Sequence, residues 1–532
     1  MRLRRLLQAL FLALFFLLFL TASYALVGLF PHDLFLRADP LAAILTLILA
    51  PAGAAVFLPA LAVAVSALLM GRAFCGYACP LGTLLDTGAW LATARHELPG
   101  WLHRLWELKY GILLLVLVSG ALGLSLLSWV DPIVLLTRTT AVLLEPWILA
   151  SGSLGLEALR PLASRLDWVG LANAALPSPL YWLTGLSGAL IGIIVGLSLW
   201  RSRLWCRLLC PLGALLGLLG TWAPLRRRVD EGCVDCGACA KACPMGVVGE
   251  DPRMARHVDC LRCRRCAEAC PAGAIDFVPM GQLQDPAPAE GPALSRRGLL
   301  AAGAVGLLVG ATTRVDAGKA GPRDRLIRPP GALPEEEYLD RCLRCGLCMG
   351  ACVSHTLQPS LWQAGLEGIW TPRLDLRLAP CEKHCNVCGQ VCPTRAIRPL
   401  PLQERLYAKI GTAVLLRERC LVWEQDKTCL VCDEICPYDA IEFREVEGRR
   451  RPFVTENRCN GCGYCEHKCP VHGESAIIVA RMGELRLASG SYIAEARQRG
   501  FVFEGSREET ESRPDPSIPE GKLPPGFILD QK

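Results

Sequence analysis

Charged side chains are scarce in this chain. They make up 20% of its 532 residues, whereas hydrophobic residues make up 52%, a composition too apolar for an ordinary soluble protein. Neither sign of charge dominates, because 56 Lys and Arg residues stand against 50 Asp and Glu residues. A net charge of +6 over this length gives no indication of nucleic-acid binding. The basic residues matter through their positions beside apolar segments.

The chain also lacks the string C-x-x-C-H, which attaches c-type haem. This absence excludes the haem-carrying class of membrane quinol oxidases. Cysteine itself is abundant, with 28 residues, and most of them stand two or three residues apart in dense runs. Thiols at that spacing converge on one point, whereas the disulfides of an exported protein join distant positions. The pattern therefore predicts metal or cluster binding.

Six runs of four cysteines account for 24 of the 28. Three runs follow C-x2-C-x2-C-x3-C-P, one has Val353 in place of the proline, and two have a longer first gap. In chain order the runs are Cys233, Cys236, Cys239 and Cys243; Cys260, Cys263, Cys266 and Cys270; Cys342, Cys345, Cys348 and Cys352; Cys381, Cys385, Cys388 and Cys392; Cys420, Cys429, Cys432 and Cys436; Cys459, Cys462, Cys465 and Cys469.

Iron–sulfur chemistry explains this spacing. Three closely spaced thiolates wrap one [4Fe–4S] cubane, and the fourth, before proline, ligates the other cluster of a pair. In the first two runs we therefore expect Cys270 to complete the cluster of the first run and Cys243 to complete that of the second. Zinc also binds C-x2-C pairs, but zinc sites rarely repeat four cysteines in so short a run. The last four runs pair either sequentially or nested, first with fourth and second with third.

Short apolar pairs follow several runs and indicate the β-strands of bacterial-ferredoxin-like α+β domains. Examples are Ala274 with Ile275 and Ala396 with Ile397. Residues 441–443 and 452–455, joined through Gly448, read as one hairpin. We expect a two-cluster domain at 229–280 and a four-cluster domain at 335–485, giving about six [4Fe–4S] clusters.

Apolar segments before the first run predict an α-helical membrane domain over residues 1–228. The second is broken by two prolines and reads as one kinked span, with a re-entrant pair as the alternative. A cleaved signal peptide is the alternative for the first, whose apolar run is too long for that reading. Basic flanks predict that both ends of the domain face the cytoplasm. The four expected spans are 6–30, 41–70, 110–130 and 180–200.

Four cysteines stand outside the runs. Cys75 and Cys79 follow the second expected span as C-x3-C-P, and Cys206 and Cys210 follow the fourth in the same form. The two pairs form an internal repeat, and we expect both at the same depth in the membrane, at the cytoplasmic ends of their spans. They could bind a metal or a seventh cluster or act as a redox dithiol; buried thiols at helix ends are the structural alternative.

The remaining segments connect the domains. Residues 281–294 read as a linker, and residues 505–532 as a disordered tail. Arg296 and Arg297 open an uncharged stretch within 295–313. This stretch reads as a twin-arginine-like segment retained as a fifth span, or as a plain basic flank. Only the first reading places the four-cluster domain outside the cytoplasm.

On these motifs the chain resembles two known proteins joined. Residues 1–280 resemble NapH-type membrane quinol dehydrogenase ferredoxins, through four spans, paired C-x3-C-P motifs and a two-cluster domain. Residues 295–485 resemble NapG/MauM-type ferredoxins, through paired arginines followed by four cysteine runs. The fusion and the missing proline after Cys352 depart from these patterns. The resemblance implies a multi-pass protein of the cytoplasmic membrane, with its first ferredoxin domain cytoplasmic and its second periplasmic.

The same resemblance implies the function. Electrons would pass from membrane quinol through the clusters towards a periplasmic oxidoreductase, such as a nitrate-reductase-type enzyme. We expect no catalytic residue of its own, and whether the chain counts as a quinol dehydrogenase stays open. The alternative is an accessory factor that supports the maturation of a metal-containing reductase or oxidase, in which the C-x3-C-P cysteines would act.

Overall fold

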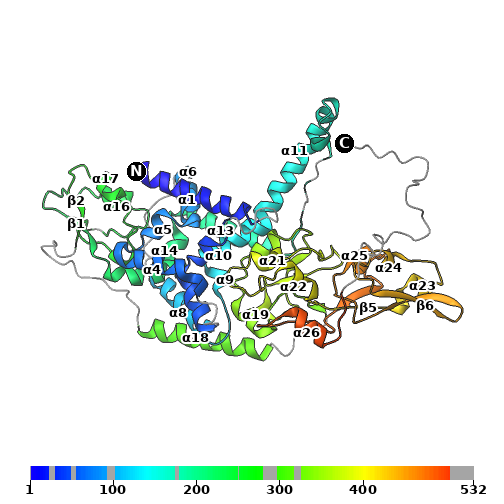
Figure 1. Ribbon diagram of the computed structural model, residues 1–532. Helices are drawn as coiled ribbons and strands as arrows, with labels where there is room; N and C mark the ends of the chain where they lie inside the picture. The colour runs from blue at the N-terminus through cyan, green and yellow to red at the C-terminus, as the bar shows by residue number, and fades with distance from the viewer. Residues whose placement is uncertain are drawn as a thin grey trace. The chain divides into compact units, whose positions relative to one another are not determined.

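The computed structural model describes residues 2–22, 30–49, 55–92, 102, 104–173, 176, 179–249, 251–279, 296–316 and 325–503 (Figure 1). The predicted linker, the predicted tail and part of the first expected span lie outside these residues. The chain divides into two compact units. Unit 1 comprises Met1–Leu374, Asn386–Pro401 and Arg486–Ala488; unit 2 comprises Asp375–Cys385, Leu402–Leu485 and the chain from Ser489.

The helical part of unit 1 is built from two halves that repeat one order of elements. In each half an aspartate and a proline start a helix, and a cysteine and a proline start another. The first half contains α1 (Arg2–Leu20), α2 (Leu34–Arg37), α3 (Pro40–Leu49), α4 (Leu58–Met70), α5 (Ala73–Tyr77) and α6 (Pro80–Leu91). The second contains α8 (Leu108–Ala121), α9 (Leu127–Val130), α10 (Pro132–Thr139), α11 (Glu145–Arg165), α12 (Val169–Ala172), α13 (Thr184–Trp200), α14 (Leu204–Leu208) and α15 (Pro211–Leu219).

Two described helical stretches are long and apolar enough to cross a membrane, Leu3–Leu20 and Pro132–Arg165. The expected span at 41–70 contains two helices, α3 and α4. Between them lie residues 50–54, which are not among the described residues. The expected span at 110–130 is covered by α8 and α9, and that at 180–200 by α13. The sequence did not predict the helix at 132–165, where α10 and α11 join through a π-helical turn at Thr140–Leu144.

Helix α18 (Arg296–Asp316) packs along α8. The contact uses a G-x3-G pair, in which Gly306 faces Val118 and Gly310 faces Leu122. A Cβ at Gly310 would lie 2.5 Å from the Leu122 side chain, so only glycine permits this approach. The segment expected as a leader or a fifth span is therefore a helix packed on the helical domain.

The first ferredoxin domain follows α15 directly. Strand β1 (Leu225–Val229) pairs antiparallel with β2 (Ile275–Pro279), with Arg227 opposite Phe277. Short helices α16 (Ala238–Ala242) and α17 (Arg265–Glu268) carry the third cysteine of each run. The strand expected after Cys270 is confirmed, and its partner β1 is a strand that the sequence analysis did not predict.

One buried carboxylate of this domain accepts several hydrogen bonds from the helical part. Asp259 accepts hydrogen bonds from Arg72 Nη1 (2.8 Å), Trp106 Nε1 (2.6 Å) and Lys109 Nζ. All four side chains are buried. Beyond α13, Ser202 Oγ donates to the carbonyl of Pro244 (3.3 Å). The first ferredoxin domain therefore lies against the start of α8 and the end of α13.

Residues 325–374 lie against the other ends of the same helices. Beyond the end of α8, the carbonyl of Ser125 accepts a hydrogen bond from Arg344. Before the start of α13, Tyr181 Oη donates to the carbonyl of Met349 (3.1 Å). This part contains α19 (Glu335–Arg341), α20 (Leu347–Gly350), the antiparallel pair β3 (Leu357–Pro359) and β4 (Pro372–Leu374), and, from a later segment of unit 1, α21 (Val387–Gln390).

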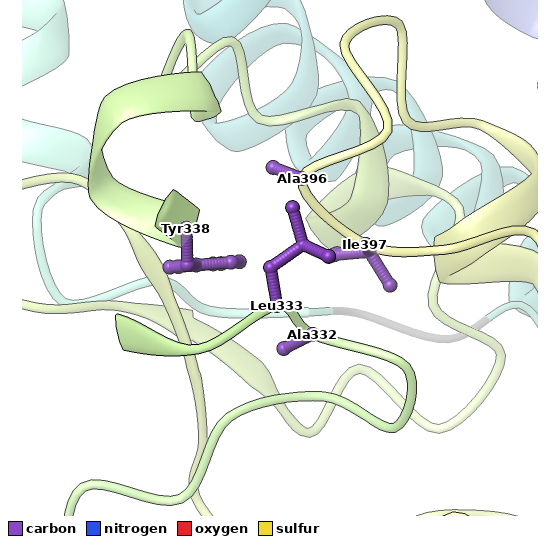
Figure 2. Close-up of a cluster of buried hydrophobic side chains, with 5 residues drawn as sticks. All are labelled: Ala332, Leu333, Tyr338, Ala396 and Ile397. Carbon is purple, nitrogen blue, oxygen red and sulfur yellow. The ribbon is translucent and has the colours of Figure 1, made fainter. Parts of the chain in front are cut away.

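Figure 2 shows the small core of this part, where Tyr338 on α19 lies beside Leu333 and the pair Ala396 and Ile397. The strand expected at Ala396 and Ile397 is reduced to an isolated bridge between Ile397 and Ala332. Cys342, Cys348, Cys388 and Cys392 pack against this core.

Unit 2 contains two further antiparallel pairs. The hairpin expected around Gly448 is confirmed, with Ile441 opposite Val454 and Phe443 opposite Pro452. Its elements are α22 (Leu402–Tyr407), β5 (Thr412–Leu415), α23 (Leu421–Glu424), α24 (Val431–Glu434), β6 (Ile441–Val446), β7 (Arg449–Val454), α25 (Tyr464–Lys468), β8 (Ile477–Ala480) and α26 (Tyr492–Gln498), with β5 paired to β8.

Candidate metal centres

Four cysteine runs share one backbone path. The residues just before and just after the second cysteine both adopt positive φ, and the latter starts the short helix that carries the third cysteine. Two left-handed residues turn the chain around a point, so three thiols of one run face the same space. The residue pairs are Asp235 and Gly237, Arg262 and Arg264, Arg344 and Gly346, Gly461 and Gly463.

In the first ferredoxin domain, the second run gathers around the last cysteine of the first run. The thiols of Cys263, Cys243 and Cys266 all act electrostatically on Cys260. Burial raises the pKa of Cys260 to about 12, although the backbone N–H of Arg262 opposes the shift. A free thiol here stays protonated at neutral pH, so metal binding has to displace the proton. The expected role of Cys243 as the exchanged fourth thiol fits this grouping.

The other thiols of that domain belong to the first run and to Cys270. Cys239 is buried, Cys233 and Cys270 are half-buried, and Cys236 is exposed. Helix α16, which carries Cys239, packs against α17. The first run therefore lies nearer the surface than the second, at the side of the domain open to solvent.

A second grouping lies in the 325–401 part of unit 1. Cys342, Cys345 and Cys348 interact electrostatically with Cys392, the last cysteine of the following run. Burial raises the pKa of each of the three thiols in the first run. Here too the fourth thiol comes from the neighbouring run, and Cys342, Cys348 and Cys392 all pack against the small core whose five residues Figure 2 draws.

Two hollows in the described part of unit 2 are each lined by four cysteines. One is lined by Cys420, Cys429, Cys432 and Cys469. The other is lined by Cys436, Cys459, Cys462 and Cys465. Each run of three thus meets the fourth cysteine of the other run. The last two runs pair with each other, so the nested alternative is wrong.

The run from Cys381 to Cys392 is divided between the units. Cys388 and Cys392 belong to unit 1, as does Cys352, whose thiol lies 3.8 Å from the hydroxyl of Ser354. Cys381 and Cys385 belong to unit 2. There Arg405 donates to the thiol of Cys381 (3.2 Å) and to the carbonyl of Cys385 (3.0 Å).

The four cysteines of the C-x3-C-P motifs are all buried in the helical part of unit 1. Cys75 lies on α5 and Cys206 on α14, while Cys79 and Cys210 form the N-caps of α6 and α15. The two pairs lie at the end of the helical part that adjoins the first ferredoxin domain.

These groupings have the ligand set of iron–sulfur clusters, because four cysteine thiolates hold a [4Fe–4S] cubane. Among the described residues, no three His, Cys, Asp or Glu side chains form a group that could hold a single metal ion. The two hollows of unit 2 have four thiols and almost wholly apolar walls, which suits a buried cluster.

Comparison with known families agrees with this chemistry. A family described as a 4Fe-4S binding domain matches residues 52–109 and 181–229. Families described as 4Fe-4S dicluster domains match residues 232–275 and 427–472. The protein therefore binds multiple iron–sulfur clusters.

Curated relatives are ferredoxin-type proteins. The methylamine utilization ferredoxin-type protein MauM of Paracoccus denitrificans is 41% identical over 169 residues, which are 30% of this chain and 74% of the relative. The ferredoxin-type protein NapG of Escherichia coli is 35% identical over 153 residues, 27% of this chain and 65% of the relative. The putative electron transport protein YccM of E. coli is 32% identical over 200 residues, 36% of this chain and 46% of the relative. No solved structure matches the chain.

Proposed function

Because the chain belongs to the family of ferredoxin-type proteins that includes MauM, we propose that it is a membrane-bound electron carrier. In this proposal it takes electrons from the quinol pool and passes them towards a periplasmic oxidoreductase. Residues 1–280 would act as a NapH-type membrane module fused to the MauM-type segment.

The thiol groupings support a set of six [4Fe–4S] clusters. Such clusters supply reversible one-electron transfer when bound. Five sites draw their ligands as follows: Cys233, Cys236, Cys239 and Cys270; Cys260, Cys263, Cys266 and Cys243; Cys342, Cys345, Cys348 and Cys392; Cys420, Cys429, Cys432 and Cys469; Cys459, Cys462, Cys465 and Cys436. The cysteines that remain in the six runs are Cys352, Cys381, Cys385 and Cys388, and the sixth cluster is expected from the count of six runs of four.

One observation supports the proposed path of electrons across a membrane. Helices α8 and α13 each have one end beside the first ferredoxin domain and the other beside residues 325–374 of unit 1. At 1.5 Å per residue they rise about 21 Å and 26 Å, a large part of a bilayer core. This supports cluster sites on both sides of the membrane, with the helical part between them.

The distribution of polarity supports a bilayer around the helical part. Large apolar side chains are exposed along its helices, including Leu10 and Leu17 on α1, Leu61 on α4, Trp147 on α11 and Ile193 on α13. Charged side chains are buried inside, as Arg72, Lys109, Arg138 and Arg203 show. An apolar exterior around a polar interior is costly in water and favourable in lipid.

The test is reduction by quinol. The full chain is purified without oxygen, placed in lipid vesicles and mixed with a short-chain quinol analogue. We expect the visible absorbance of the clusters to bleach, and to recover when an electron acceptor is added. Dithionite serves as the control that the clusters are intact. If dithionite bleaches the absorbance and quinol never does, the quinol part of the proposal is wrong.

A further inference from the structure

The two halves of the helical part carry copies of one longer motif. Residues 72–82 and 203–213 both read R-x2-C-x3-C-P-x-G. The arginine and the glycine extend the C-x3-C-P pattern at identical distances. Each copy has only two cysteines, so neither copy alone can hold a four-thiol cluster.

Both copies fold in the same way. The first cysteine lies on a short helix, and the second caps the next helix with its sulfur. The thiol of Cys79 accepts from the N–H of Gly82 (3.4 Å), and that of Cys210 accepts from the N–H of Gly213 (3.3 Å). Capping by a sulfur points both thiols at a helix N-terminus, where the dipole favours the thiolate.

The two copies exchange their arginines. Arg72 donates through Nη2 to the carbonyl of Cys206 (3.2 Å), and Arg203 donates through Nη1 to the carbonyl of Cys75 (2.9 Å). Each arginine precedes one cysteine pair and is hydrogen-bonded to the other, which fixes the two short helices side by side. A Cβ at Gly213 would overlap Arg72, so this glycine makes room for the crossing.

This crossing brings the four thiols into one neighbourhood. The thiol of Cys75 acts electrostatically on Cys79, Cys206 and Cys210. Cys206 in turn acts on Cys79 and Cys210. All four are free thiols, and each is at most 8% exposed.

Buried charge around the thiols is unbalanced. Arg4, Arg72, Lys109 and Arg203 are buried cations, and among the described residues they form ion pairs with two buried carboxylates, Asp86 and Asp259. An excess of buried cations is costly unless an anion is present. A cubane bound by four thiolates is such an anion, because the thiolates outweigh the charge of its core.

We propose that Cys75, Cys79, Cys206 and Cys210 together hold one further [4Fe–4S] cluster, shared between the two halves of the helical part. The 4Fe-4S family match covers both copies, each with two of the ligands.

The shared site lies beside another proposed cluster, with which it could exchange electrons. The Leu261 backbone packs on Gly76 of α5, and Tyr77 Oη donates to the carbonyl of Arg262 (3.1 Å). These residues follow Cys260 directly, so the shared site adjoins the second cluster of the first ferredoxin domain. One electron would pass between the two clusters with no bond made or broken. This step rests on the proposed function, which places a cluster at Cys260.

The experiment measures iron and acid-labile sulfide in the full chain, purified in detergent without oxygen. We expect Cys75→Ser and Cys206→Ser each to lose about four irons per chain. The double variant should lose the same amount as either single one, because both cysteines serve one cluster. Equal iron in the single variants and the unsubstituted chain overturns the proposal, and so does an additive loss in the double variant.

Cys462→Ser is the control for the proposed function, since it removes a ligand of a ferredoxin-type cluster. If it loses iron and the C-x3-C-P variants do not, only the seventh cluster is wrong; if it loses none, the proposed function fails. Native mass spectrometry of the unsubstituted chain covers the case in which the serine variants do not fold. Seven clusters are expected, whereas six clusters, or a copper or zinc ion beside six, overturns the proposal.

Discussion

Buried ionic groups of unit 1 show how single residues join its parts. Asp259 receives three donors from the helical part, two of them cations that are fully buried. The carboxylate of Asp86 similarly accepts hydrogen bonds from Arg203 and Gln8, which lie on separate segments. Removing one partner of a buried ion pair leaves a charge that nothing compensates, which costs about 3–5 kcal/mol.

We therefore predict that Asp259→Ala lowers the free energy of unfolding by about 3–5 kcal/mol, because Arg72 and Lys109 would stay buried without a counter-charge. Denaturant unfolding of the full chain in detergent, followed by cluster absorbance, measures the change. Asp276→Ala is the matched control. Its carboxylate lies 3.7 Å from Arg264 and both side chains are more than half exposed, so we expect a change below about 0.5 kcal/mol. Equal effects of the two substitutions would contradict this role of Asp259.

Glu335 gives a prediction about pH. Burial alone would raise the pKa of Glu335, but Arg328 at 2.6 Å and Arg486 at 2.5 Å lower it to about 2. Because the folded-state pKa lies below the ordinary 4.5, the stabilisation is full above about pH 4.5 and is lost as the pH falls towards 2. The shift corresponds to at most about 3 kcal/mol.

Glu335→Gln should therefore lower the unfolding free energy by about 2–3 kcal/mol, equally at pH 7 and pH 5. Glu337→Gln is the control, since its half-exposed carboxylate lies 3.6 Å from Arg341 in a surface pair. Denaturant unfolding at both pH values measures the effect. A loss that is already smaller at pH 5 than at pH 7 would show that the depressed pKa of Glu335 is not its cause.

At the scale of elements, the contact between α18 and α8 depends on glycine. Gly310→Ala would place a methyl group 2.5 Å from Leu122, and we expect it to destabilise the chain by about 1–3 kcal/mol. Gly303→Ala meets nothing within 4 Å and removes a flexible residue from a helix, so it should be neutral or stabilising by up to about 1 kcal/mol. Thermal loss of cluster absorbance measures both. The same sign for both substitutions would mean that the packing of α18 on α8 contributes no stability.

Some elements follow from local pattern and others do not. The hairpin around Gly448 was predictable because strand propensity and a turn glycine agree within a short segment. Strand β1 was not, because Arg226 and Arg228 make the segment look like the basic flank of a span. The helix at 132–165 was missed because Pro146 and Pro161 suggest breaks, whereas Pro146 occupies a first turn. The repeated Asp-Pro starts at Asp39 and Asp131 were a usable signal for the duplication.

The candidate sites divide in the same way. Spacing was enough to predict that Cys243 joins the thiols of the second run, because three near thiols and one distant thiol are a local property of the run. The matching role of Cys270 stays a prediction. It could not choose between sequential and nested pairing, since both use the same spacing. The crossing of Arg72 and Arg203 depends on two segments that are far apart in the chain, so no local pattern contains it.

At the scale of the whole molecule, we propose that the C-terminal cluster sites face the periplasm. An epitope tag fused after Lys532 should therefore be removed by a protease added to spheroplasts, which reaches only the periplasmic side. Arg296→Lys with Arg297→Lys should protect the tag if the paired arginines direct export of the folded module. A tag that the protease leaves intact on the unsubstituted chain would contradict a periplasmic position.

The central claim is that one chain carries a series of one-electron centres. Anaerobic coulometric titration of the full chain with a low-potential mediator counts them directly, because each [4Fe–4S] cluster accepts one electron. We predict an uptake of about seven electrons per chain, six from the cysteine runs and one from the shared site, with reversible bleaching. A chain that contains zinc and accepts no electrons would contradict the account.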